Sequence, residues 1–517
     1  MEYAAAHPMP VAMPGVVCLL GFLRPGRGDI DALLVELGFN VAQAAVPVFL
    51  LAELGYPAGL AISHILPGSA LGFAVGAFWL AVMGVRLAAR EHRRDVTAHV
   101  YGSNVPGIIA FTLSIMIPVF HQTRDPLAAW AVAAAAAIWT GIFKVAAAPL
   151  SQYLRALVPK PAAMTVFAAA MYTYLGMALL VRLFDQPIVG LCALALVFVG
   201  LFADIPFTRY RIPGFLVVWL VPLAIAIGLG YTTPRFGGLR FTIPAVISLA
   251  PLWKLPAAVP FFSVIIPVAL YQMIQDLAAV EAADTTGDRY ELAGILLGDG
   301  IATIIGGIAG SPITNLVYSL QPPFKKLGAR VAFQFWTPLI YLGLTVAGLG
   351  PVGAQLFPWP ILAAITTWVA VEVGMTAIRA VPARHRPALL FGLLIPAGYL
   401  LSAPITSSLF ALHLDPASPA VTGALEHAIY WQAVLGLADG FLLVTLVSSA
   451  VIVYLIDHRF TAAGAWGLVG AGLSWFGVIH SARVGWRAAP AYALGWLALA
   501  VLTFAARWYR GPPQPNG

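Results

Sequence analysis

Runs of about 20 apolar residues recur along the chain, and each is long enough to cross the ~30 Å hydrocarbon core of a bilayer as a helix. Hydrophobic residues make up 61% of the chain and charged residues only 9%, which leaves too few polar side chains to cover a soluble globule. We therefore predict an all-α polytopic membrane protein. The predicted spans are 30–53, 60–86, 104–121, 127–149, 162–182, 186–205, 213–231, 258–281, 291–309, 314–325, 331–350, 359–379, 387–411, 428–456, 462–481 and 488–508.

Basic residues in alternate connections between these spans predict the topology. If every span crosses, these residues fall on one side of the membrane, which the positive-inside rule makes cytoplasmic. We expect 14 to 16 crossings with both termini cytoplasmic, in the cell membrane (inner membrane) of a bacterium. The basic residues are Arg86, Arg90, Arg93, Arg94, Lys144, Arg155, Lys160, Arg209, Arg211, Lys325, Lys326, Arg330, Arg379, Arg384, Arg386, Arg507 and Arg510.

The remaining global features exclude several classes of protein. The net charge of +7 is spread singly or in small groups, so we interpret it as a topology signal and expect no nucleic-acid partner. Cys18 and Cys192 lie in separate apolar segments and predict neither a metal site nor a disulfide. No nucleotide-binding or metal-binding motif is present, and we expect no cofactor.

Two polar interruptions occupy matching places in the apolar pattern. The third span of the first half opens with Tyr101-Gly102-Ser103-Asn104-Val105-Pro106-Gly107, and the third span of the second half opens with Gly310-Ser311-Pro312-Ile313-Thr314-Asn315. Seven spans precede the long connection at 232–257. Because seven is an odd number, the second half enters the membrane from the opposite side. Paired interrupted segments in an inverted repeat indicate a transporter site, although each motif alone is also compatible with a loop and a helix cap.

The predicted organisation follows from this repeat. It comprises a retained N-terminal interfacial segment (1–29), a first inverted repeat (30–231), a connecting segment (232–257), a second inverted repeat (258–456), and a C-terminal hairpin with its tail (457–517).

Three stretches carry a resemblance to a known family. Pro267-Val268-Ala269-Leu270 and the run from Gly298-Asp299-Gly300 to Asn315-Leu316-Val317-Tyr318 resemble spans eight to ten of the xanthine/uracil permeases, the nucleobase-ascorbate transporter family. The segment from Val96 to Asn104 resembles their third span, and the similarity is greatest to an uncharacterised bacterial branch. The resemblance implies a 14-span, seven-plus-seven inverted repeat with core and gate domains. It also implies short extended segments in spans 3 and 10, with helix N-termini directed at the substrate.

The chain differs from this family at the acidic residues with which the family binds the nucleobase. The family's glutamate in span eight aligns with Gln275, and its acid or amide after the span-ten strand falls near Ser319-Leu320-Gln321. An amide can still donate to and accept from a nucleobase edge. Proton coupling, however, requires a titrating group, which leaves Asp276, Glu281 or Asp284.

The predicted site combines the interrupted segments with span eight. We assign proton coupling to Asp276 and Glu281, and we expect Asp284, Asp288 and Glu291 to be solvated loop residues. Asp299 is expected either to pair with a neighbouring group or to contact substrate. His64, His99, His480, Glu372 and Asp439 are weaker candidates without assigned partners. The predicted substrate-binding residues are Gln275, Asp276, Ser311, Thr314, Asn315, Tyr101, Ser103 and Asn104.

These residues predict a permease that moves a nucleobase such as xanthine or uracil by alternating access, as a proton symporter, and not an enzyme. Two alternatives remain open. The first is a carrier of a small organic or inorganic anion, since converging helix N-termini favour negative charge. The second is an integral-membrane enzyme that uses Asp276 and Glu281 as acid and base. The expected partners are a small-molecule substrate, the lipid bilayer, a proton or sodium co-substrate, and a second copy in a homodimer.

Overall fold

The computed structural model describes residues 21–53, 64–203, 214–233, 249–347, 356, 358–412, 414, 418–482 and 484–508. Most of the predicted interfacial segment, much of the connecting segment 232–257 and the last residues of the C-terminal tail lie outside these ranges. So do Arg209, Arg211 and Arg510 of the topology prediction.

The helices of the first half follow the predicted spans to within a few residues. The elements, with η for 3-10 or π turns, are α2 (Arg27–Glu53), α4 (Leu66–Arg90), β1 (Val100–Ser103), α5 (Val105–Phe111), η2 (Thr112–Met116), α6 (Ile117–Thr123), α7 (Pro126–Ala147), η3 (Ala148–Leu150), α8 (Ser151–Leu157), α9 (Lys160–Met171), η4 (Tyr172–Met177), α10 (Ala178–Leu180), η5 (Val181–Leu183), α11 (Pro187–Val197), η6 (Phe198–Phe202) and α12 (Gly214–Gly228).

The second half repeats this order of elements. It contains α13 (Ala250–Trp253), α14 (Leu255–Ala258), η7 (Val259–Phe261), α15 (Phe262–Asp284), α16 (Leu292–Ile308), β2 (Asn315–Tyr318), α17 (Gln321–Lys326), α18 (Phe333–Val346), α20 (Trp359–Ala380), η8 (Ala383–His385), α21 (Arg386–Gly392), α22 (Ala397–Ala411), α23 (Pro419–Ile429), α24 (Trp431–Ala438) and α25 (Phe441–Ile456), followed by α26 (Phe460–Trp475), α27 (Pro490–Ala505) and η9 (Ala506–Trp508).

Many of the helices have the composition of membrane spans. Among the described residues, seven helices are individually long and apolar enough to cross a bilayer, and an eighth arises if α24 and α25, bent by 77°, are counted as one span. The predicted span 314–325 is a four-residue strand followed by a six-residue helix. The protein is therefore a multi-pass, all-α membrane protein with short extended segments in spans 3 and 10, as predicted.

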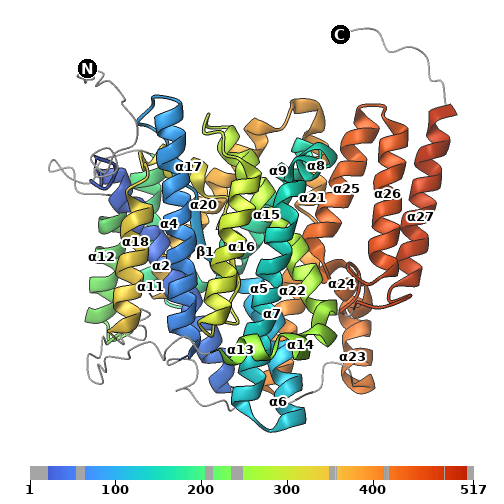
Figure 1. Cartoon of the computed structure of the whole chain (residues 1–517), viewed down its shortest axis with the longest axis horizontal. Coiled ribbons are helices and arrows are strands. Elements are labelled where there is room, and N and C mark those ends of the chain that lie inside the picture. The colour runs from blue at the N-terminus through green and yellow to red at the C-terminus, as the bar shows by residue number, and fades with distance from the viewer. Residues whose placement is uncertain are drawn as a thin grey trace.

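Helix packing follows an inverted repeat. Helices α2 and α4 of the first half pack on α18 of the second half, and helices α15 and α16 of the second half pack on α7 of the first half. Each contact between the halves thus has a counterpart in which the equivalent helices have exchanged halves. Figure 1 shows these helices side by side in one bundle, with β1 near its centre.

The two interrupted segments meet each other as a pair of short strands. β1 and β2 pair antiparallel, with Tyr101 opposite Val317 and Ser103 opposite Asn315. Equivalent strands that run in opposite directions are what a two-fold axis in the membrane plane produces. The strand pairing therefore places the two matched motifs of the sequence at one point.

The helices form two packed groups around this point. The core group contains α2, α4, β1, α5 to α7, α15, α16, β2, α17 and α18. The gate group contains α9, η4, α11, α12, α20 to α22, α24 and α25, in which α9 packs on α25 and α11 packs on α20. The added hairpin of α26 and α27 packs against α25 (Figure 1).

Basic connections meet at one end of α15, as the topology prediction requires. Arg155 and Lys160 both pair with Glu281, and Arg93 and Lys325 both pair with Asp288 just beyond the helix. Lys144 is an exception: it is fully buried in α7 and does not belong to a connection. Counting Lys144 as a topology charge was therefore wrong, because its ammonium group is neutralised inside the bundle.

Candidate substrate site

A cavity of about 50 Å³ lies where the strand ends face the gate group. Polar side chains enter it from the core group: Gln43 of α2, Ser103 and Asn104 at the end of β1, and Tyr271 and Gln275 of α15. The gate group contributes Met171, Tyr174 and Leu175, and the remaining lining residues are Phe39, Leu316, Tyr318 and Leu320. One water needs roughly 10–15 Å³, so the cavity has room for more than one. It is a polar site at the junction of two helix groups.

Two polar atoms in this cavity are buried without a partner. Ser103 Oγ and Gln275 Oε1 have no hydrogen-bond partner among the described residues, and their side chains are 1% and 3% exposed. Leaving a buried polar group unpaired costs roughly 1–3 kcal/mol, which a bound solute or water can recover. The unpaired atoms therefore point to a ligand.

A hydrogen-bond network fixes the polar wall behind the cavity. Asn104 Nδ2 donates to Thr314 Oγ1 at 3.0 Å, and Gln272 Nε2 donates to the same oxygen at 2.8 Å. The Tyr271 hydroxyl donates to Asn104 Oδ1. The amide of Asn104, in the first half, is thereby held in one orientation by Thr314 and Tyr271 of the second half.

Behind β2, a cluster of charges is buried away from the cavity. Lys144 Nζ donates to Asp299 Oδ2 and, at 2.9 Å, to the backbone carbonyl of Asn315, and it lies 3.9 Å from Asp276 Oδ2. Asp276 Oδ1 accepts a hydrogen bond from Val317 N at 3.2 Å, and the Tyr101 hydroxyl donates to Asp299 Oδ1 at 2.7 Å. We call Asp276, Lys144 and Asp299 the β2 anchor.

A related cluster holds β1. Glu36 Oε1 of α2 accepts from Tyr101 N at 2.9 Å and from Gln334 Nε2 of α18 at 2.5 Å. Gln334 Nε2 also donates to the backbone carbonyl of His99 at 2.6 Å. We call Glu36 and Gln334 the β1 anchor. Both anchors bind the same backbone positions, because Tyr101 and Val317 are register partners and His99 and Asn315 each precede them by two residues.

The predicted substrate-binding residues divide among three places. Gln275, Ser103 and Asn104 line the cavity, and Thr314 supports Asn104. Asp276, Tyr101 and Asn315 belong to the β2 anchor or contact it. Ser311 lies in a turn, where its Oγ accepts from Ile313 N at 3.1 Å.

The predicted coupling and weaker residues are also placed. Glu281 lies at the cytoplasmically assigned end of α15, paired with Arg155 and Lys160. Asp284 pairs with Arg155, and Asp288 is fully buried in a network with Arg93 and Lys325, so predicting Asp284 and Asp288 as solvated loop residues was wrong.

The remaining weak candidates have different surroundings. Glu291 is exposed and pairs with Arg90, as a solvated residue would. Glu372 pairs with Lys326 at 2.6 Å, and Asp439 sits at the bend between α24 and α25. His480 accepts from Trp496 Nε1, whereas neither ring nitrogen of the buried His99 has a partner among the described residues. The ring of His64 packs edge-on against Trp130.

Sequence reasoning missed several residues that the structure brings to the site. Tyr271 precedes Gln275 by one helical turn, so helix periodicity could have identified it. Lys144 lies within a 22-residue apolar helix, and its position inside the apolar run was the signal of a functional charge. Gln43 and Tyr318 carried no such signal, because only the strand pairing brings the Tyr318 hydroxyl to 2.5 Å from Gln43 Oε1.

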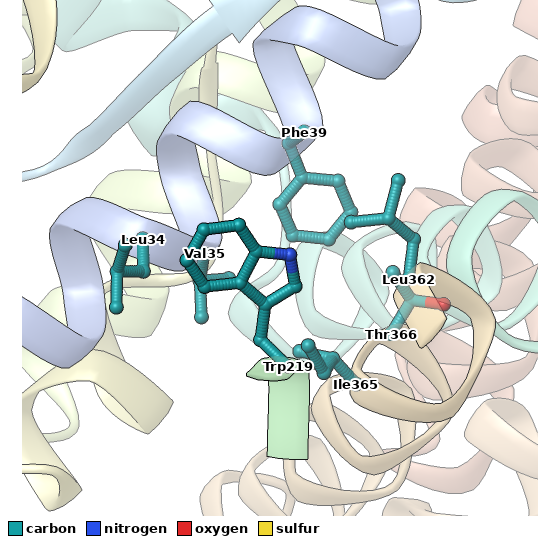
Figure 2. A pocket seen from close by; sticks show the side chains of 7 residues that line it. All are labelled: Leu34, Val35, Phe39, Trp219, Leu362, Ile365 and Thr366. Carbon is teal, nitrogen blue, oxygen red and sulfur yellow. The ribbon is translucent and has the colours of Figure 1, made fainter. Parts of the chain in front are cut away.

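A second, smaller void marks the apolar side of the junction between core and gate. It measures about 10 Å³ and lies between α2, α12 and α20. Figure 2 shows the indole of Trp219 projecting among Val35 and Phe39 on one side and Leu362, Ile365 and Thr366 on the other. A void of this size and composition does not suit a polar solute. Phe39 lines both spaces and separates them.

No protein-family model matches the chain, and no curated protein matches it. Among solved structures, the transmembrane domain of the bicarbonate transporter BicA from a cyanobacterium aligns over 84% of this chain and 97% of its own length, with 15% sequence identity and a TM-score of 0.41. These comparisons do not support the predicted membership of the xanthine/uracil permease family.

Proposed function

We propose that this protein is a secondary-active transporter that moves a small polar solute across a membrane by alternating access. The observation that carries the proposal is the position of the cavity, which takes most of its polar lining from the core group and a wall of Met171, Tyr174 and Leu175 from the gate group. A site at the interface of two helix groups becomes accessible from either side when one group moves against the other.

The interface between the two groups suits such a movement. Near the cavity the gate group presents Met171 and Leu175, and at the second void the contact consists mainly of apolar side chains. Apolar contacts are non-directional, so they can exchange partners as helices slide. The fully buried ion pairs of Lys144 and the two strand anchors lie within the core group, which we propose moves as a unit, while Lys160–Glu281 and Lys326–Glu372 pair a half-exposed lysine with a carboxylate of the other group.

The chemistry of the lining favours a planar, uncharged solute. Four aromatic side chains face the cavity, together with the amides of Gln43, Asn104 and Gln275 and the hydroxyl of Ser103. The described lining residues include no charged side chain. Amides read the donors and acceptors of a heterocycle's edge, and aromatic rings pack on its faces. A nucleobase such as uracil or xanthine therefore remains the leading substrate.

A small anion is the second candidate substrate. Ser103 and Asn104 immediately precede the helical segment 105–123, whose first-turn N–H groups carry partial positive charge toward the cavity. Ser103 Oγ, unpaired and buried beside that turn, is a suitable donor to an anion.

Asp276 is the residue that we propose couples transport to a proton. Its Oδ2 atom has no hydrogen-bond partner among the described residues, and its Oδ1 atom accepts from a strand whose residues line the cavity. Glu281 instead pairs with Arg155 and Lys160 at the end of α15 and does not line the cavity.

Thermal stability in the presence of candidate solutes tests the proposed site. A ligand that binds the native state raises its apparent stability by mass action. We expect uracil or xanthine to raise the apparent Tm of the detergent-purified protein, and Gln275→Leu to remove the effect. The matched control is Thr503→Val in α27, a buried hydroxyl that bonds only within its own helix. A rise in apparent Tm with inorganic anions but not with nucleobases would favour the anion carrier. A Gln275→Leu protein with the same ligand-induced rise in Tm as wild type would show that this cavity is not the site.

A further inference from the structure

Lys144 lies in surroundings that resemble the coordination shell of a metal cation. Its ammonium contacts Asp299 Oδ2, the backbone carbonyl oxygen of Asn315 at 2.9 Å, and, more distantly, Asp276 Oδ2 at 3.9 Å. All three side chains of this cluster are fully buried. Backbone carbonyls outside helices hold coupling cations in many transporters, and carboxylate and carbonyl oxygens are the usual ligands of hard metal cations. The contacts of Lys144 are thus those of a bound ion.

The symmetry-related anchor shows what the ammonium adds. At the equivalent position in the other half, Gln334 makes the same contact to a backbone carbonyl and bonds one carboxylate, Glu36. The β2 anchor differs by having a lysine in place of the amide and a second carboxylate, Asp299. Helix α4, which corresponds to the helix of Asp299, contains no acidic residue. The extra positive charge and the extra negative charge therefore occur together, and the net charge of the two anchors is the same.

We propose that Asp276, Asp299 and the Asn315 carbonyl form a cation site that the chain fills with its own Lys144 ammonium, so that this anchor takes no free metal cation. The second carboxylate is present to balance the lysine. Asp276 Oδ2, which lacks a hydrogen-bond partner among the described residues, is the oxygen left for a further cation once Lys144 is removed. This inference deepens the proposed function by excluding a metal ion as the coupling ion at this anchor.

Removal of the ammonium group gives a direct test that needs no transported substrate. The probe is sodium chloride against choline chloride at equal ionic strength, and the readout is the apparent Tm in detergent. Wild type is expected to show the same Tm in both salts. Lys144→Ala is expected to be destabilised in choline chloride and to recover by at least ~2 °C in sodium chloride, because sodium binds the vacated oxygens. Lys160→Ala, which removes a half-exposed lysine from an ion pair, is the matched control and is expected to show no sodium effect.

A second variant keeps the test decisive if Lys144→Ala does not fold. Lys144→Gln combined with Asp299→Asn copies the amide of the β1 anchor and restores its charge balance. We expect the double variant to fold, to be more stable than Lys144→Gln alone, and to show no sodium effect. Sodium-selective stabilisation of wild type overturns the proposal, and so does a Lys144→Ala protein that folds without any response to sodium. A double variant no better than Lys144→Gln also overturns it. These apparent Tm values do not depend on transport activity. Failure of the proposed transport function can therefore be distinguished from failure of this inference.

Discussion

The β1 and β2 anchors hold equivalent backbone atoms with different chemistry. At β1 a carboxylate and an amide bind the strand, whereas at β2 a carboxylate and an ammonium bind it and a second carboxylate pairs with the ammonium. The backbone contacts are the same in both, so the strand geometry does not require the ion pair. The difference indicates that the inverted repeat fixes the positions of the polar groups that bind the strands. The charges of the side chains at those positions differ between the two halves. Four predictions test this comparison.

The largest expected effect is a loss of stability when the hydrogen-bond donor of each anchor, Lys144 or Gln334, is removed. Lys144→Met leaves two buried carboxylates without a cation and is expected to cost ~3–5 kcal/mol. Gln334→Met removes a neutral donor from one carboxylate and one carbonyl, which is expected to cost about 1–3 kcal/mol. Apparent Tm values of both variants in the same detergent measure the difference. Equal losses would show that the β2 anchor does not behave as an ion pair.

The next effect concerns coupling. Asp276→Asn retains an acceptor for Val317 N and leaves Lys144 paired with Asp299, so we expect a folded protein whose uracil or xanthine uptake no longer depends on pH. Glu281→Gln removes an ion pair at the end of α15, and its uptake is expected to keep the pH dependence of wild type. Uptake into proteoliposomes at several external pH values separates the two variants. A normal pH profile in Asp276→Asn would remove this residue from the coupling mechanism.

A smaller effect compares two equivalent serines. Ser103 follows β1 Tyr101 by two residues and lines the cavity, and Ser319 follows β2 Val317 by two residues but does not line it. Both hydroxyls are buried without a partner among the described residues. Loss of a ligand hydrogen bond is worth about 1 kcal/mol, so Ser103→Ala is expected to weaken solute binding roughly fivefold, and Ser319→Ala to leave it unchanged. Titration calorimetry with the solute that stabilises wild type provides the dissociation constants.

The smallest effect lies in the loop before β1, outside the membrane-spanning segments. A hydrogen bond from the Arg93 guanidinium lowers the pKa of the Asp95 carboxyl below its usual range. A carboxyl with a depressed folded-state pKa stabilises the protein above its unfolded pKa, near 3.9, and loses that contribution as pH falls through the folded value. Because Asp95 is largely exposed, Asp95→Asn is expected to lower stability by less than ~1 kcal/mol at pH 7.

The pH dependence of this difference provides the check. Apparent Tm values of wild type and Asp95→Asn are expected to begin converging below pH ~4 and to meet once the pH is below the lowered folded-state pKa of Asp95, where the wild-type carboxyl is protonated. A difference that persists unchanged at low pH would show that Asp95 acts through something other than its charge.

Much of this arrangement follows from local sequence signals. Apolar runs predict the helices, and the Gly/Ser/Pro-rich segments beginning at Tyr101 and Gly310 predict the two interruptions that become β1 and β2. Gln275, Ser103 and Asn104 were predicted as site residues, and all three line the cavity. These features are readable because they depend on residues close together in the chain.

The remainder depends on contacts between distant segments. Lys144 and Asp299 are 155 positions apart, and Glu36 and Gln334 are 298 apart, so no local pattern connects them. Gln275 and Asp276 are neighbours in α15 and therefore point to different sides of the helix. The structure places Asp276 in the β2 anchor and Gln275 in the cavity. Which of the two faces meets the gate group is decided only by tertiary packing.

We propose that the protein carries a solute through the cavity between the core and gate groups. Uptake of the stabilising solute into proteoliposomes, compared among wild type, Gln275→Leu and the Thr503→Val control, tests it most directly. We expect saturable uptake by wild type and by Thr503→Val, with at least tenfold slower uptake by a folded Gln275→Leu protein. Binding without uptake in wild type, or full uptake by Gln275→Leu, would contradict it.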